Sequence, residues 1–191
     1  MRRALEEAMT LPKILGICGS LRIDSYNRRL LEAATEALPD AEWTIARIRG
    51  IPPYDGDLEA RGLPPAVDRL KMEISEADAV VIATPEYNHS IPGVLKNAID
   101  WASRPAMRSP FVDKPVLMLA ATTGRGGAKR ALGHLRQVLD SMEASPLSTE
   151  VSVARARDRF TDGAPDAELR GELRAALSEL PIRTPEPAAI R

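Results

Sequence analysis

The chain has 191 residues, of which 44% are hydrophobic and 28% are charged, and its formal net charge is −1. This length suits one well-buried domain and is short for two. The near-neutral charge argues against nucleic acid or an anionic membrane surface as the main partner. No apolar run is long enough to cross a bilayer, and the first residues lack the continuous apolar stretch of a secretory signal. We therefore expect a cytoplasmic enzyme or carrier.

Cysteine and histidine are rare in this chain. Cys18, the single cysteine, excludes an intramolecular disulfide and lies in an apolar run, where a small buried side chain is the favoured interpretation. His89 and His134 have no histidine or cysteine partners at ligand spacing. A structural or catalytic metal site is therefore not expected.

Strands and helices alternate along the chain. Apolar runs and helical spacing predict strands at 13–18, 43–48, 79–83, 116–121 and 147–153, the second more exposed and the fifth weak. They predict helices at 26–38, 64–77, from about 92, at 128–142 and at 166–180. The segments 52–56 and 162–166 read as loops.

Such alternation with nearly continuous apolar strands indicates a parallel sheet covered on both faces. We expect an α/β, flavodoxin-like three-layer fold whose five-stranded parallel sheet has the order 2-1-3-4-5. Residues 1–191 would form one domain, with an N-terminal extension at about 1–11 and a flexible tail at about 181–191. In this topology, ligands bind beyond the carboxyl ends of the strands.

The loop after the first strand is rich in hydrogen-bond donors. Ser20, Ser25 and Asn27 offer neutral donors, Arg22 offers a charge, and Gly19 would let the chain turn sharply out of the strand. The loop is neither a P-loop nor a Gly-x-Gly-x-x-Gly dinucleotide motif. The alternative is a plain N-cap formed by a side chain at 24–25. Because four donors crowd into eight residues, the pattern favours a phosphate site.

The loop after the third strand is stiff and partly flat. Pro85 and Tyr87 offer flat apolar surface, and Glu86 and Asn88 offer hydrogen bonds to the edge of a ring. The alternative is a simple helix entry with Ser90 as the cap, which suits residues 91–101 and leaves 85–88 unexplained.

The loop after the fourth strand is glycine-rich and should lie on the same rim, because strands three and four adjoin. Its backbone at 121–124 could approach a ligand closely. A phosphate cradle, a flat wall and a glycine-rich wall together suit a mononucleotide with a planar head group, and FMN is the natural candidate in this topology.

Two motifs carry a family resemblance. Gly-Ser-Leu-Arg-x-x-Ser-x-Asn at 19–27 and Pro-Glu-Tyr-Asn-x-Ser-x-Pro-Gly-x-x-Lys-Asn-Ala-x-Asp-Trp at 85–101 resemble the NADPH-dependent FMN reductase family, which includes quinone and chromate reductases and azoreductases. The resemblance implies FMN as cofactor, NADPH or NADH as co-substrate, a small-molecule electron acceptor, and a homodimer or homotetramer. It implies that FMN contacts Ser20, Arg22, Ser25, Tyr26, Asn27, Pro85, Glu86, Tyr87, Asn88, Ala121, Thr122, Thr123 and Gly124.

The function expected from this resemblance is ping-pong hydride transfer, in which the nucleotide and the acceptor use one flavin face in turn. The acceptors would be quinones, free flavin, azo compounds or metal oxyanions. No side-chain acid or base is required, so no catalytic residue is assigned. His89 and Arg125 could face the flavin, and Arg104 could reach a neighbouring subunit.

Two other classes share this fold. A flavodoxin-type electron carrier usually docks through an acidic face, which a net charge of −1 supports poorly. A receiver-type or hydrolase domain would need an acidic cluster for magnesium, and only Asp24 lies near the first loop.

Overall fold

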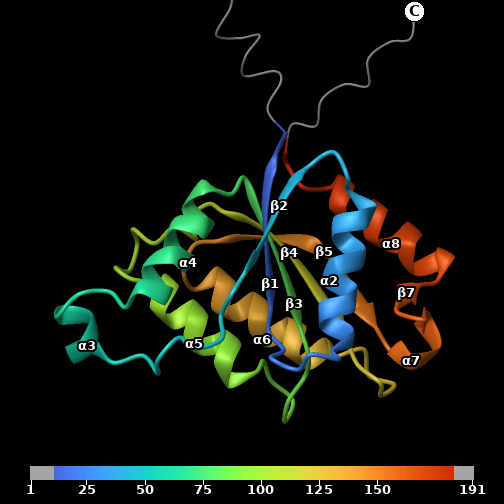
Figure 1. Ribbon diagram of the computed structural model, residues 1–191, viewed down its shortest axis with the longest axis horizontal. Coiled ribbons are helices and arrows are strands. Elements are labelled where there is room, and N and C mark those ends of the chain that lie inside the picture. Colours follow the sequence, from blue (N-terminus) through green and yellow to red (C-terminus); the bar gives the residue numbers. More distant parts are fainter. Residues whose placement is uncertain (1–10, 183–191) are drawn as a thin grey trace, which may run out of the picture.

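The computed structural model describes residues 11–182, and at its centre lies a five-stranded parallel sheet in the order β2-β1-β3-β4-β5 (Figure 1). This is the order that the sequence predicts. The strands are β1 (Lys13–Cys18), β2 (Glu42–Ala46), β3 (Ala79–Thr84), β4 (Pro115–Ala121) and β5 (Ser145–Val153). β3 and β4 are buried along almost their whole length because helices cover both faces, which explains their uninterrupted apolar sequence.

Helices lie between the successive strands of the sheet, as expected for parallel pairing, and also after its last strand. They are α2 (Tyr26–Ala37), α3 (Gly56–Ala60), α4 (Pro65–Glu76), α5 (Gly93–Ala102), α6 (Lys129–Asp140), α7 (Ala156–Arg159) and α8 (Ala167–Ser178). None of the helices among the described residues is long and apolar enough to cross a membrane.

The hydrophobic core has two halves, one on each face of the sheet. Helices α4, α5 and α6 bury Leu70, Leu95 and Leu135 against one face. Helices α2 and α8 bury Leu31 and Leu173 against the other, so the molecule has three layers (Figure 1). The three-layer prediction is therefore confirmed.

Short elements within predicted loops are the main differences from the sequence-based expectation. Helix α3 begins at the last residue of the turn-rich segment at 52–56, with the Asp55 carboxylate accepting a 2.8 Å hydrogen bond from the N–H of Asp57. β6 (Phe160–Thr161) and β7 (Ala164–Pro165) form a small hairpin whose turn residues, Asp162 and Gly163, both have positive φ. The proposed extension and tail lie almost wholly outside the described residues.

The loops that follow β1, β3 and β4 emerge at the same edge of the sheet, at the bottom of Figure 1. Gly19, directly after β1, lies in a bend and does not have a positive φ. A Cβ at Gly19 would lie 3.0 Å from Leu95 and 3.3 Å from the hydroxyl of Thr84. The chain therefore turns at Gly19 as expected, and close packing also leaves little room for a side chain there.

Candidate active site

The three predicted loops meet around one pocket of about 200 Å³. Eleven of the thirteen predicted FMN contacts line it: Ser20, Arg22, Ser25, Tyr26, Asn27, Pro85, Glu86, Tyr87, Ala121, Thr122 and Thr123. Asn88 and Gly124 are the two predicted residues that do not. Residues from three separate parts of the sequence therefore converge as the topology predicts.

The wall formed by the first loop combines buried hydroxyls with a free helix start. Ser20 and Ser25 are 3% and 5% exposed, although both line the pocket. Ser25 occupies the N-cap position of α2, but its side chain makes no capping hydrogen bond. The simple N-cap interpretation of Ser25 is therefore wrong. The first N–H groups of α2 and two hydroxyls are left to face a ligand, and a helix N-terminus favours an anion.

Arg22 supplies the positive charge of this wall. Its side chain is exposed and forms no ion pair with any residue between 11 and 182. The nearby Asp24, in contrast, is paired with Arg29. Two hydroxyls, a helix start and an unpaired guanidinium are the donor set that a phosphate monoester requires, so the residues present fit the phosphate end of FMN.

Asn27 has a different role from the predicted phosphate donor. Its Nδ2 donates to the carbonyl of Ala121 at 2.9 Å, and its Oδ1 accepts from the N–H of Ala121 at 2.8 Å. Asn27 is 3% exposed, so this pair of bonds fastens the first turn of α2 to the end of β4. The backbone of Ala121 is likewise engaged with Asn27. Both residues line the pocket mainly as parts of its frame.

The second loop is a tight two-residue turn. Tyr87 and Ser90 exchange both backbone hydrogen bonds, at 2.9 and 3.0 Å. Asn88 and His89, between them, have φ values of 49° and 65°, the left-handed conformation that a type I′ turn requires. The sequence therefore uses Asn88 for the turn itself, which explains its absence from the pocket. Ser90 likewise belongs to the turn and does not cap the following helix, whose N-cap is Pro92.

Glu86 fastens this turn to helix α6. Its Oε2 accepts hydrogen bonds from the N–H groups of Arg130 and Ala131 at 3.1 and 3.3 Å. Partial burial by itself would raise the pKa of Glu86, but the N–H of Ala131, the His89 ring and the N–H of Arg130 outweigh burial and lower it. Glu86 is thus an ionised cap of α6, a role that the sequence motif does not reveal.

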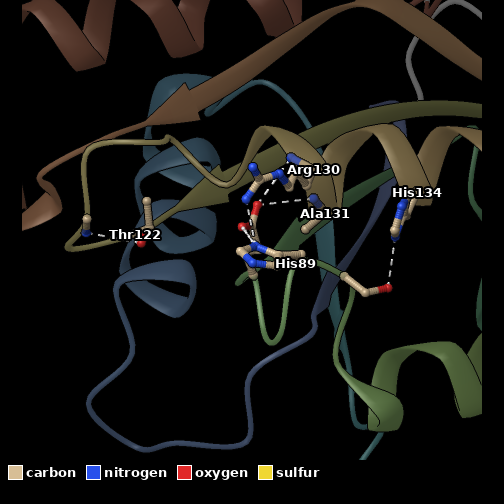
Figure 2. A network of polar contacts seen from close by, with 8 residues as sticks. His89, Thr122, Arg130, Ala131 and His134 are labelled. Atoms are coloured by element: carbon tan, nitrogen blue, oxygen red, sulfur yellow. Dashed lines mark hydrogen bonds and ion pairs between the residues drawn. The ribbon is translucent and has the colours of Figure 1, made fainter.

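Two further contacts hold the turn against α6 (Figure 2). The guanidinium of Arg130 lies 2.7 Å from His89 Nδ1. His134 Nδ1 lies 3.0 Å from the Ser90 hydroxyl. The side chain of His89 is 72% exposed, so it stands at the rim of the site. The sequence did not place Arg130 and His134 at this site because each lies more than 40 residues from the side chains that it contacts.

The third loop is held by the segment that follows β5. The carbonyls of Thr122 and Gly124 accept from the N–H groups of Ala156 and Arg155, at 2.9 and 2.8 Å. The N–H of Gly124 donates to the Thr122 hydroxyl at 3.2 Å. Thr122 and Thr123 line the pocket, whereas Gly124 turns back into its own loop. The predicted glycine wall is therefore built by the two threonines.

Arg104 and Arg125 differ in their surroundings. The guanidinium of Arg104 lies 5.0 Å above the ring of Tyr54, so within this chain it stacks on an aromatic side chain. Arg125 is exposed in the third loop and does not line the pocket. The buried thiol of Cys18 has a raised pKa because burial disfavours its charged form, as expected for an inert core residue.

The sequence pattern that defines the NADPH-dependent FMN reductase family matches residues 12–158. The chain belongs to this family. An NAD(P)H-dependent FMN reductase of Pseudomonas aeruginosa is 49% identical over 150 residues, which are 78% of this chain and 80% of that protein. The quinone reductase of Escherichia coli strain K12 is 41% identical over 135 residues, 69% of this chain and 71% of that protein.

A solved structure has the same architecture. FerB, an NAD(P)H:acceptor oxidoreductase from Paracoccus denitrificans, superimposes with a TM-score of 0.79 at 32% identity, covering 88% of this chain and 97% of that one. This FMN reductase family member is therefore an oxidoreductase whose cofactor is FMN and whose co-substrate is a nicotinamide nucleotide. Membership of this reductase family decides against the two alternative functions, an electron carrier and a receiver-type or hydrolase domain.

Proposed function

We propose that this protein is an FMN-dependent NAD(P)H oxidoreductase that works as a single domain and passes electrons to small acceptors, with quinones as the main class and free flavin, azo compounds and metal oxyanions as further ones. One pocket carries the proposal. One of its walls is the uncapped N-terminus of helix α2 with Ser20 and Ser25, and another is the flat surface of Pro85 and Tyr87. Bound FMN would supply the hydride chemistry.

The residues divide between two tasks. Ser20, Ser25 and Arg22 would hold the phosphate, because they supply the hydroxyls and the charge at the start of α2. Pro85 and Tyr87 would support the flat ring, and the exposed side of Tyr87 leaves that wall open to solvent. An open wall lets a nicotinamide and an acceptor approach in turn, which supports a ping-pong order.

FMN binding tests the phosphate assignment. Each charge-assisted hydrogen bond to a phosphate contributes about 1.5–3 kcal/mol, so Ser25→Ala and Arg22→Ala should each weaken FMN binding roughly tenfold or more, measured by quenching of flavin fluorescence. Ser178→Ala, which removes an exposed hydroxyl on α8, is the matched control and should leave the affinity unchanged. If the purified protein takes up no FMN, the proposed function is wrong. If FMN binds equally well to the Ser25 and Arg22 variants, only the phosphate assignment is wrong.

The reaction order and acceptor class need steady-state kinetics. With NAD(P)H and a benzoquinone varied together, double-reciprocal plots should be parallel, because the nucleotide leaves before the acceptor binds. Intersecting lines would refute the shared-site order. Rapid NAD(P)H oxidation by the purified protein and a small quinone alone would support an enzyme, whereas a requirement for a protein partner would support a carrier.

We also propose that the protein forms a homodimer or homotetramer and acts in the cytoplasm, where reduced nicotinamide nucleotides are supplied. A groove of about 500 Å³ between the start of α5 and helix α6 supports an assembly. Ile91 and Val138 line it, and the neighbouring Val94 is 36% exposed. Light scattering of the FMN-loaded protein should give twice or four times the mass of 20.8 kDa, and a monomer would refute the proposed assembly.

A further inference from the structure

A second pocket, of about 300 Å³, opens between the carboxyl ends of β1 and β2 and is lined by nine residues. It shares Ser20 with the FMN pocket, so the two sites are neighbours. Six of its residues carry the argument: Ser20, Leu21, Arg28, Ile45, Arg47 and Arg49. None of the arginines belongs to a motif that marks the flavin site.

The side chains that line this pocket carry three positive charges and no negative one. Arg28 and Arg47 are exposed, and neither guanidinium makes an ion pair or hydrogen bond with any residue of the described part of the chain. Arg49 is held in place because its Nη2 donates to the carbonyl of Leu21 at 2.6 Å. Glu32, one helical turn after Arg28, forms no ion pair within 4.0 Å in the described part of the chain, but it lies close enough to raise the pKa of Cys18 and so offsets part of the positive charge. Three guanidiniums that form no ion pair with the described residues share one pocket, which favours an anion.

The pocket also contains apolar surface. Ile45, on β2, is 46% exposed, and Leu21 contributes a second aliphatic side chain. A free phosphate ion would gain nothing from these residues, whereas the adenine and ribose of a nucleotide could pack on them. The thiol of Cys18 lines the floor, but it is buried and its pKa is raised by burial. The Cys18 thiol is therefore not a nucleophile here, and the side chains of this pocket suit binding of a ligand instead of a chemical reaction with it.

We propose that the Arg28–Arg47–Arg49 pocket binds the 2′-phosphate of NADPH, together with the adjoining adenosine, and so makes NADPH the preferred co-substrate. This inference rests on the proposed function, since it places the far end of a dinucleotide whose nicotinamide reaches the flavin wall. In dinucleotide-binding α/β folds, an acid recognises the ribose hydroxyl of NADH, and an arginine accommodates the 2′-phosphate. Here Arg47 directly follows β2, and residues 46–50 contain no acid.

Kinetics of the FMN-loaded protein test the assignment. Because both guanidiniums are exposed, their contacts with phosphate are screened by solvent. We therefore expect the double variant Arg28→Gln/Arg47→Gln to lower the ratio of kcat/KM for NADPH to kcat/KM for NADH roughly tenfold, which corresponds to about 1.4 kcal/mol. The loss should appear in the KM for NADPH. Arg174→Gln, which removes one exposed charge from α8, is the control and should leave the ratio unchanged.

Direct binding separates the nucleotide from a free anion. Calorimetric titration of the FMN-loaded protein should show tighter binding of adenosine 2′,5′-bisphosphate than of 5′-AMP, and the preference should shrink in the double variant and at high ionic strength. Inorganic phosphate at the same ionic strength should compete weakly, since it lacks the adenosine. Strong competition by inorganic phosphate would show a general anion site and overturn the assignment to NADPH.

Two results would distinguish failure of this inference from failure of the proposed function. A yellow, FMN-loaded protein that oxidises NADH and NADPH with equal kcat/KM, and binds the two adenosine phosphates equally, would overturn the pocket assignment and leave the oxidoreductase intact. A protein that takes up no flavin would overturn both. Arg47→Lys adds a further check. Lysine keeps the positive charge but cannot form the two parallel hydrogen bonds of a guanidinium, so this variant should keep only part of the wild-type preference for NADPH.

Discussion

Replacing Glu86 should loosen the flavin-facing turn from helix α6. The carboxylate accepts two backbone hydrogen bonds, at 3.1 and 3.3 Å, from the first turn of α6. Loss of a helix cap costs about 0.5–2 kcal/mol, and these distances are at the long end of the usual range, so we expect Glu86→Ala to cost about 1 kcal/mol. For a domain of this size, that corresponds to a fall in Tm of about 2–4 °C.

Glu86→Gln separates the geometry of the cap from its charge. The amide oxygen of glutamine can still accept both hydrogen bonds, while the attraction of the charge to the helix N-terminus, about 0.3–1 kcal/mol, is lost. Urea unfolding of the FMN-free protein should therefore rank wild type above Glu86→Gln and Glu86→Ala last. Glu36→Ala, which removes an exposed carboxylate of α2 without bonds among the described residues, should stay within about 0.5 kcal/mol of wild type.

The pH dependence of this difference follows from the lowered pKa of Glu86. Because the folded-state pKa lies below the ordinary value of 4.5, the stabilisation is fully present above the unfolded-state pKa and is lost as pH falls through the folded-state pKa. The gap between wild type and Glu86→Ala should thus be constant from neutral pH to about pH 5, and in more acid solution it should narrow to the gap between Glu86→Gln and Glu86→Ala, because a protonated carboxyl still has an oxygen that accepts. Equal unfolding midpoints at pH 7, or a glutamine variant as unstable as the alanine variant, would refute the capping role.

Three further substitutions test the frame of the site. Asn27→Ala should cost about 2–4 kcal/mol in urea unfolding, because the backbone groups of Ala121 lose both partners in a buried position; a loss below about 1 kcal/mol would contradict that role. Gly127→Ala and Gly163→Ala form a matched pair, since both positions have positive φ, but only at Gly127 would a Cβ meet a serine hydroxyl of β5, at 2.2 Å. Gly163→Ala should lower the free energy of unfolding by about 1 kcal/mol, and Gly127→Ala should lower it by about 2–4 kcal/mol. Equal losses of the two variants in chemical unfolding would show that the Ser152 side chain rotates away from the new methyl group. Asp166→Asn should lower the free energy of unfolding by about 1–2 kcal/mol at pH 7, because the carboxylate caps α8 and pairs with the Arg159 guanidinium, which lowers its pKa. The difference from wild type should vanish as pH falls through this lowered pKa. A difference that persists at acid pH would contradict the ionic role.

The fold was predictable because its strands carry an unusually direct signal. Strands such as β3 are buried on both faces, so their sequences are continuous apolar runs, and the helices between them require parallel pairing. Once the order of the strands was inferred, the loops after β1, β3 and β4 had to share one edge. That placement brought eleven predicted residues to one pocket without any information about distances.

The roles of individual side chains were less predictable, because they depend on partners far along the chain. Asn27 and Ala121 are 94 residues apart in sequence, and Glu86 lies 44 residues from Arg130. A motif records that an amide or a carboxylate is needed, but the same side chain could serve a ligand or a neighbouring backbone. Asn88 shows the same limit within its own loop, since only the positive φ of the turn distinguishes a turn residue from a ring contact.

Net charge is a further case in which a property of the whole chain hides a local one. A balance of 26 basic and 27 acidic residues argues against a polyanionic partner, and it says nothing about where the charges lie. The structure pairs Arg29, Arg136 and Arg159 with acids, whereas Arg28 and Arg47 have no ion pair among residues 11–182. Field strength at a pocket depends on its nearest charges, because exposed charges more than about 10 Å away are largely screened. A neutral protein can therefore select a nucleotide by one phosphate, provided that its unpaired arginines share one pocket.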